Sequence, residues 1–129
     1  MIRKSVFLLT LFLAQAAIAG PPSEPFCFLP GKPFETRFLG DWELAQWKVR
    51  YSAFMRGQQV CLQAHDLSAD EWFDIPEVQW DGKVLQAAFV LPSTKWRTES
   101  QLSLTQDNRI RDEYSYRDGR RVEYWTRYK

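Results

Sequence analysis

The chain of 129 residues carries 17 basic and 16 acidic side chains, so its formal net charge is only +1. This balance leaves no field of one sign to hold a nucleic-acid backbone or an anionic membrane surface, and we expect no nucleic-acid partner. Aromatic residues make up 16% of the sequence, which indicates that bulky rings fill much of a single hydrophobic core.

Residues 1–19 have the features of a secretory signal peptide. Arg3 and Lys4 form a short cationic start, residues 5–16 are almost all apolar, and residues 17–19 read A-I-A, a typical cleavage pattern. The apolar run is shorter than the roughly 18 residues of a membrane-spanning helix. Gly20, and not the cysteine that lipid attachment requires, stands directly after the cleavage pattern. We therefore expect an exported protein, periplasmic or secreted, that is soluble after signal cleavage.

Cys27 and Cys61 are the only cysteines, and in an oxidising compartment they predict a disulfide. The sequence has neither a CxxC motif nor a second histidine to favour a redox pair or a metal site. Cys27 lies in a proline-rich N-terminal arm, residues 20–39, which we expect to be extended and without regular ladder hydrogen bonds. The disulfide would tie this arm to the domain formed by residues 40–129.

From residue 40 onward, apolar and polar side chains alternate with the two-residue period of β-strands. The strands that this pattern predicts cover residues 40–51, 60–64, 78–80, 84–91, 96–104, 110–116 and 122–128. A change of phase near residues 45–46 indicates a bulge. Residues 66–73 interrupt the pattern as one short helix or loop, and Asp118-Gly119 predicts a tight hairpin.

About seven short strands with regularly spaced turns predict a mainly β fold. Its form is either a small antiparallel up-and-down β-barrel or a strongly curled meander. One face of the predicted strands is rich in glutamine, glutamate, lysine and arginine, whereas a membrane barrel needs a continuous apolar outer face. We therefore expect a protein that does not span a membrane.

Two short motifs resemble those of the lipocalin-like (calycin) barrels. Residues 40–42 read G-D-W at the start of the β region, and residues 125–127 read W-T-R on the last strand. The resemblance implies that Trp42 plugs the closed end of a barrel, and that Arg127, or alternatively Arg121, packs across its ring as a cation. It also implies a small apolar or amphipathic ligand in the barrel mouth. Taken alone, Trp42 is better explained as an ordinary core tryptophan.

The sequence lacks the side chains that most catalytic sites require. His65 is the only histidine, and no nucleophile elbow, phosphate-binding loop or set of metal ligands accompanies it. Asp112 and Glu113 are neighbours on a predicted strand, so their carboxylates point to opposite faces and cannot act together. We expect no catalytic residue, no metal and no cofactor, and we predict that the protein is not an enzyme.

Aromatic side chains are the strongest candidates for a binding site. The predicted ligand-binding residues are Trp72, Phe73, Trp80, Trp96 and Tyr114, because rings stack on ligands or enclose apolar groups, although core packing explains such rings as well. Two functions follow from these predictions. One is an exported, non-enzymatic binding protein for a small apolar or amphipathic ligand. The other is a protein-interaction module, such as an envelope accessory factor or an enzyme inhibitor, that binds an exported protein through loops and strand edges.

Overall fold

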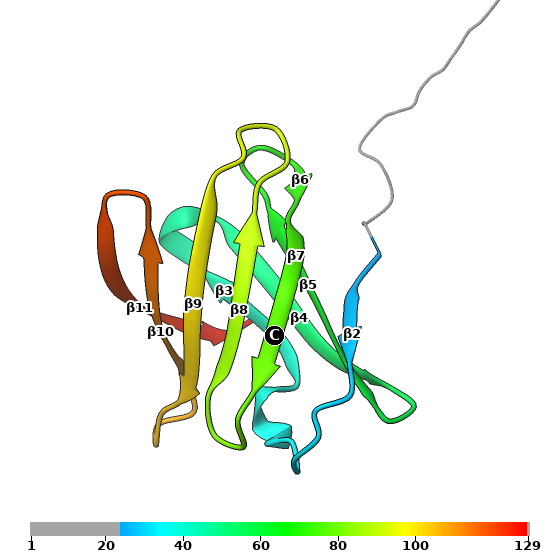
Figure 1. The fold of residues 1–129 in the computed structure, drawn as a ribbon. Coiled ribbons are helices and arrows are strands. Elements are labelled where there is room, and N and C mark those ends of the chain that lie inside the picture. Colours follow the sequence, from blue (N-terminus) through cyan, green and yellow to red (C-terminus); the bar gives the residue numbers. More distant parts are fainter. Residues whose placement is uncertain (1–23, 129) are drawn as a thin grey trace, which may run out of the picture.

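The computed structural model describes residues 24–128, and these form a nearly closed antiparallel β-barrel (Figure 1). The predicted mainly β fold class is therefore confirmed. The predicted signal peptide, residues 1–19, and the first residues of the predicted arm lie outside the described residues.

The described residues form ten strands rather than the predicted seven. They are β2 (Phe26–Phe28), β3 (Gly40–Leu44), β4 (Val49–Arg56), β5 (Gln59–Asp66), β6 (Glu71–Trp72), β7 (Asp74–Trp80), β8 (Leu85–Val90), β9 (Arg97–Leu104), β10 (Ile110–Tyr116) and β11 (Gly119–Arg127). Two short 3₁₀ helices, η2 (Thr36–Phe38) and η3 (Ala45–Trp47), lie at the two ends of β3. The three additional strands arise because β2 and β6 were not predicted, and because the first predicted strand is divided into β3 and β4.

The sheet follows the order β2-β5-β4-β3-β11-β10-β9-β8-β7, so most neighbours in the chain are also neighbours in the sheet. Strand β3 pairs with β11, the last strand of the chain, with Trp42 opposite Arg127 and Glu43 opposite Thr126. The strands at the two ends of this order, β2 and β7, form no ladder with each other, so the barrel is open on that side. Pro76 in β7 has no amide hydrogen to donate to a ladder, and proline is found within sheets mainly on edge strands such as this one.

The short strand β2 corrects the prediction that residues 20–39 form no ladder hydrogen bonds. Phe26–Phe28 pairs antiparallel with β5, and Cys27 lies directly opposite Cys61. Pro25 and Pro30 flank these three residues, none of which is proline, so all three amides are free to donate. The predicted disulfide between the two cysteines is confirmed. It holds β2 on the edge of β5, beside the opening of the barrel.

Two irregular segments depart from the simple alternation. The predicted bulge near residues 45–46 is the 3₁₀ helix η3, after which Lys48 adopts a left-handed conformation with φ of 53°. The segment 66–73 contains no helix; it is a turn followed by β6. Its turn is capped by Asp66, whose Oδ1 accepts hydrogen bonds from the Ser68 and Ala69 amides at 3.0 and 3.2 Å. A side chain that satisfies these donors locally favours a turn over a helix.

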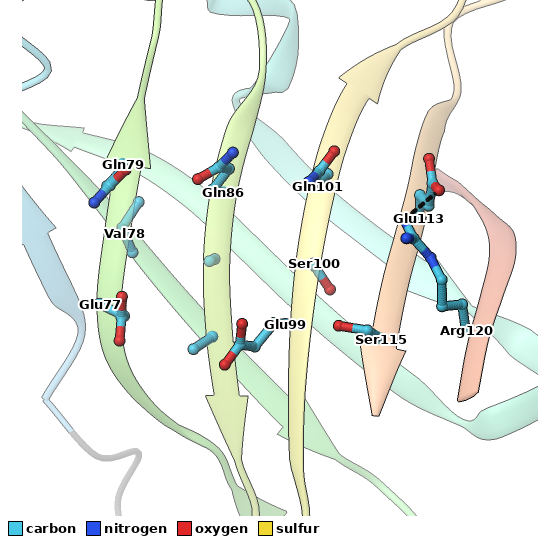
Figure 2. Close-up of a pocket in the computed structure, with 12 residues that line it drawn as sticks. Glu77, Val78, Gln79, Gln86, Glu99, Ser100, Gln101, Glu113, Ser115 and Arg120 are labelled. Atoms are coloured by element: carbon cyan, nitrogen blue, oxygen red, sulfur yellow. Dashed lines mark hydrogen bonds and ion pairs between the residues drawn. The ribbon is translucent and has the colours of Figure 1, made fainter. Parts of the chain in front are cut away.

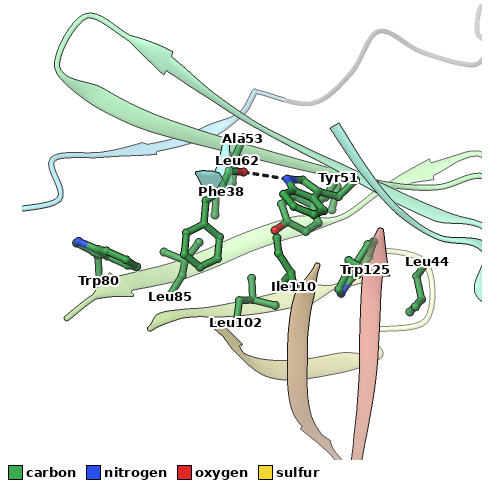
Figure 3. Close-up of a cluster of buried hydrophobic side chains, with 12 residues drawn as sticks. Phe38, Leu44, Tyr51, Ala53, Leu62, Trp80, Leu85, Leu102, Ile110 and Trp125 are labelled. Atoms are coloured by element: carbon green, nitrogen blue, oxygen red, sulfur yellow. Dashed lines mark hydrogen bonds between the residues drawn. The ribbon is translucent and has the colours of Figure 1, made fainter. Parts of the chain in front are cut away.

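The core is built from the inward-facing side chains of opposite walls (Figure 3). Its largest fully buried members are Trp42, Phe38, Leu62, Leu85, Leu102 and Ile110. Full burial of an aliphatic side chain contributes about 1.5 to 3 kcal/mol, so this set supplies much of the stability of the barrel. Phe38, Leu85 and Trp80 lie at one end, and Leu44 and Trp125 lie toward the other.

The end of the barrel near η2 is closed by Trp42 and Arg127. The Trp42 indole donates a hydrogen bond to the Phe38 carbonyl at 2.9 Å, and the Arg127 guanidinium lies 4.1 Å from the centre of the Trp42 ring. Arg127 also donates hydrogen bonds to the carbonyls of Leu39 and Arg37 at 2.6 and 2.8 Å. This arrangement is compatible with a calycin-like fold.

Glycine is favoured at residue 40 by its backbone conformation and by Arg127, which passes directly over it. Gly40 has φ of +124°, and a Cβ atom there would lie 2.6 Å from Nη1 of Arg127. The G-x-W motif therefore has two separate roles. Its glycine leaves room for the guanidinium, and its tryptophan supplies the ring on which that guanidinium rests.

Replacing Arg127 by methionine is expected to lower the free energy of unfolding by about 1 to 2 kcal/mol, after allowing for the partial solvent exposure of the guanidinium. The change removes two charge-assisted hydrogen bonds and the cation on the Trp42 ring, while retaining an apolar side chain of similar length. Urea denaturation would measure it. The matched control is Arg117→Met in the exposed β10–β11 turn, and equal stability of the two variants would contradict the prediction.

Candidate functional site

The barrel contains a cavity of about 460 Å³ in the half that lies away from η2. Aromatic side chains form a large part of its wall: Trp47, Tyr51, Phe73, Phe89, Trp96, Tyr114, Tyr116 and Trp125. This volume and this apolar character are typical of sites for small organic ligands. The cavity opens between the ends of several strands, with Trp47 and Trp96 as the most exposed tryptophans, at 49% and 45% exposure.

The two-residue period of the strands positions this lining. On β10, Asp112, Tyr114 and Tyr116 all line the cavity, whereas the residues between them face outward. Likewise Thr98, Ser100 and Leu102 of β9 line it. The residue that η3 contributes to the wall is not positioned by the two-residue period of a strand. The helix interrupts the strand alternation, and this brings Trp47 to the rim.

Three of the five predicted ligand-binding residues line the cavity. These are Phe73, Trp96 and Tyr114. The other two, Trp72 and Trp80, lie elsewhere in the barrel.

Trp72 lies outside the cavity, although its neighbour Phe73 lines it. The Trp72 ring stacks on His65, with ring centres 4.2 Å apart and planes 11° from parallel. His65 Nε2 in turn lies 3.0 Å from Asp70 Oδ1. Successive side chains in extended chain point to opposite sides, which accounts for the separation of the two neighbours.

Trp80 belongs to the closed end of the barrel. Its ring centre lies 4.8 Å from that of Phe34 and 5.7 Å from that of Phe38. Its indole donates a hydrogen bond to the Pro33 carbonyl at 3.1 Å. The position of Trp80 is therefore that of a core residue which holds the segment before η2 against the barrel.

A buried pair of carboxylates, Asp112 and Glu123, was missed by reasoning from the sequence. The two residues lie directly opposite each other on β10 and β11, and they are only 4% and 7% exposed. The hairpin that joins the two strands could have revealed that these residues are paired. Its turn consists of Arg117 and Asp118, one residue before the predicted Asp118-Gly119 turn, and counting back from it pairs Asp112 with Glu123.

Glu123 is held by three donors from the surrounding strands and from η3. Trp47 Nε1 and the Tyr114 hydroxyl each donate to Glu123 Oε2 at 2.9 Å, and Gln46 Nε2 donates to Oε1. Two of these donors come from η3, so the interruption between β3 and β4 contributes directly to the site. Glu123 itself does not line the cavity, and its role is to fix Trp47 and Tyr114 in the wall.

Asp112 is only partly satisfied. Trp125 Nε1 donates to its Oδ2 at 2.9 Å, but Oδ1 is buried and has no hydrogen-bond partner among the described residues. Burial raises the pKa of Asp112 to about 6, and the charge of Glu123 adds to this effect. The Trp125 indole and the nearby Ser100 hydroxyl lower the pKa, although Ser100 falls short of hydrogen-bond geometry.

Tyr51 is the second incompletely satisfied residue in the cavity lining. Within the described part of the chain, its buried hydroxyl has no hydrogen-bond partner. Burial and the charge of Asp112 raise the pKa of Tyr51 well above its ordinary value, so the hydroxyl keeps its proton. Its ring packs edge-on against Trp125 with ring centres 5.0 Å apart. The cavity lining thus includes a carboxylate oxygen and a phenol oxygen that each lack a hydrogen-bond partner among the described residues.

A second depression, of about 220 Å³, lies on the outer face of β7 to β10 and carries mainly polar side chains. Gln79, Gln86, Gln101 and Glu113 lie side by side across the four strands (Figure 2). Such a row of amides and carboxylates on the outside of a barrel is an ordinary solvated surface. The internal cavity is therefore the better candidate site.

Neither a metal centre nor a membrane-spanning helix is found in the part of the chain that the structure describes. No group of three histidine, cysteine, aspartate or glutamate side chains in residues 24–128 is placed to hold a metal ion. No helix within the same residues is long and apolar enough to cross a membrane.

Comparison with known proteins leaves the cavity to be interpreted from its own geometry, because no protein-family model, no curated protein and no solved structure matches this chain.

Proposed function

We propose that this protein binds a small apolar or amphipathic ligand in the barrel cavity. The observation that carries this proposal is the cavity of about 460 Å³ with eight aromatic side chains in its wall. An aromatic wall gains from contact with an apolar ligand, because the rings lose surface to water and stack on flat groups. The signal-like residues 1–19 and the Cys27–Cys61 disulfide support export as part of the same proposal.

The proposed activity is binding without catalysis. Acid–base chemistry of the glycosidase kind needs two carboxyl groups that face a common substrate. Here Asp112 lines the cavity, whereas Glu123 does not and has its oxygens engaged by three donors. The only histidine, His65, stacks on Trp72 outside the cavity. This arrangement favours a binding site over an active site.

The rim of the cavity suits entry of a ligand from solvent. Trp47 and Trp96 are about half exposed there, whereas Trp125, deeper in the wall, is 7% exposed. Arg121 lies 6.0 Å from the Trp47 ring centre, and the Trp96 ring centre lies 5.7 Å from that of Tyr116. Exposed rings around a hollow are typical of a mouth through which apolar groups pass.

Binding can be tested with N-phenyl-1-naphthylamine, an uncharged dye whose fluorescence rises in an apolar site. We expect saturable binding to the purified protein and a loss of affinity of about tenfold or more in Thr98→Trp, which places a large ring in the cavity. The control is Thr126→Trp, the same substitution at an exposed position on β11. It should bind the dye as the unmodified protein does.

Two results would overturn the proposal. One is the absence of saturable dye binding, and the other is equal binding by the two tryptophan variants. Native mass spectrometry of protein from its own exported fraction, before and after organic extraction, provides an independent test. Loss of a bound small molecule on extraction supports the cavity proposal. A bare protein that instead captures a specific exported protein through the Trp47 and Trp96 rim supports the protein-interaction module.

A further inference from the structure

Resting on the proposed function, we infer that the ligand carries a cationic amine, which is held in the cavity by the Asp112 carboxylate and the Tyr51 hydroxyl. The apolar part of such a ligand would occupy the aromatic wall. Its ammonium group would supply the hydrogen-bond donor that the two residues lack.

The first support is the pair of unpartnered polar atoms. Asp112 Oδ1 and the Tyr51 hydroxyl oxygen are both buried and have no partner within the described residues, and both residues line the cavity. A buried polar group without a partner costs about 1 to 3 kcal/mol, and more when it is charged. Asp112 accepts and never donates when ionised, so the missing partner has to be a donor.

The second support is the charge around the site. Asp112 lies directly opposite Glu123, and both carboxylates are buried. Arg121 is the only cationic side chain in that lining among the described residues, and it is exposed at the rim beside Trp47. Like charges in register on neighbouring strands repel each other, so the site favours a cation over an anion.

The third support is the aromatic environment of Asp112. Trp125 donates to its carboxylate, and the Trp125 ring packs edge-on against Tyr51. Tyr114 lies two residues along β10 and also lines the cavity. An ammonium group is attracted by the faces of such rings as well as by a carboxylate. A neutral alcohol would gain only the hydrogen bond, and a carboxylic acid would meet repulsion.

The amine therefore has to reach the buried end of the cavity rather than stop at its rim. Both unpartnered atoms are shielded from bulk water, so a small side-chain movement is needed to admit the ligand nitrogen. Ser100, on the neighbouring strand β9, also lines the cavity and has a small side chain. In return, the ammonium group replaces the solvent that Asp112 lost on burial.

Three compounds with one skeleton test the inference: 4-phenylbutylamine, 4-phenylbutan-1-ol and 4-phenylbutanoate. Each is titrated against the protein, with displacement of N-phenyl-1-naphthylamine as the readout. We expect the amine to bind at least about tenfold more tightly than the alcohol, and the acid to bind most weakly. In Asp112→Asn the amine should fall to the affinity of the alcohol, with the affinity of the variant for the dye measured separately.

The matched control is Asp66→Asn, which neutralises another carboxylate of the lining and retains a side chain able to cap the following turn. It should keep the preference for the amine. Loss of the preference in Asp66→Asn, or its survival in Asp112→Asn, would overturn the assignment of Asp112. In Tyr51→Phe we expect a smaller loss of amine affinity, because one neutral hydrogen-bonding group is removed.

The pH dependence of binding gives a second readout. The groups facing Asp112 are Tyr51 on β4, Ser100 on β9, Tyr114 on its own strand and Glu123 on β11. The pKa of Asp112 is about 6, so its negative charge is lost as the pH falls below that value. Amine affinity should therefore fall between about pH 7.5 and pH 5, and alcohol affinity should not.

The failure of this inference can be distinguished from the failure of the proposed function. If the dye binds and the three compounds compete equally, the cavity is a ligand site but the amine inference is wrong. If the dye and all three compounds fail to bind, the proposed function is wrong and the inference fails with it.

Discussion

Removal of the Cys27–Cys61 disulfide is expected to lower the free energy of unfolding by about 3 to 4 kcal/mol. The cysteines are 34 residues apart in the sequence, and the bond limits the freedom of that length of chain in the unfolded state. The double variant Cys27→Ala, Cys61→Ala avoids placing a hydroxyl at Cys61, which is fully buried. Urea denaturation of the variant and of the unmodified protein gives the difference.

The same variant should also loosen β2 from the edge of β5. Only three residues of β2 pair with β5, and Cys27 is the central one. An uncovered strand edge is a template for pairing with another chain, so we expect more self-association, measurable by light scattering. The control is the unmodified protein under reducing conditions, which should match the variant. A loss below about 1 kcal/mol would show that the ladder and core hold β2 without the bond.

Replacing Asp112 by asparagine is expected to stabilise the protein by about 3 kcal/mol at about pH 7.5 and to have little effect at about pH 3.5. The pKa of Asp112 rises from its ordinary 3.8 to about 6 in the folded protein. Below pH 3.8 both the folded and the unfolded states are protonated. As the pH rises from 3.8 to 6, the unfolded state ionises first, and the folded state loses stability relative to it. Asparagine has no charge to bury and escapes this loss.

Thermal or urea denaturation of both proteins at several pH values measures the effect. The difference between them, rather than the profile of either, reports on Asp112, because every other titrating group is shared. The control is Asp118→Asn in the exposed β10–β11 turn, which removes a carboxylate that is not buried and should not give the stabilisation expected at about pH 7.5. An Asp112→Asn difference that stays constant from about pH 3.5 to pH 7.5 would contradict the prediction.

The disulfide variant and Asp112→Asn are expected to change stability in opposite directions, and this contrast bears on function. The disulfide supports the fold, whereas the Asp112 carboxylate opposes it at neutral pH. A buried charge that reduces stability is typical of a group required by a binding site. Higher stability together with weaker amine binding in Asp112→Asn would indicate that the same carboxylate lowers stability and binds the ligand.

The strand pattern was predictable because each long strand buries one face. The strands predicted at 84–91, 96–104 and 110–116 correspond closely to β8, β9 and β10. The strands β2 and β6 were missed because two or three residues are too short to show a period. The turn of the last hairpin was misplaced by one residue, and such a shift changes which residues lie opposite each other.

The candidate site was only partly predictable for a related reason. Aromatic residues were correctly seen as candidates, yet nothing local separates Phe73, in the cavity wall, from Trp72, outside it. Trp80 has the same kind of sequence neighbourhood but packs at the closed end. The side of the sheet on which a ring lies depends on the strand register, and its end of the barrel depends on the topology.

By itself, the sequence determined the β class of the fold and the disulfide, because alternation and cysteine content are local or compositional properties. Only the tertiary structure decided that the barrel opens between β2 and β7, that Arg127 passes over Gly40, and that Asp112 lies opposite Glu123. Each of these features depends on the pairing of strands. Pairing is set by contacts between residues across the whole barrel, which no short stretch of sequence specifies.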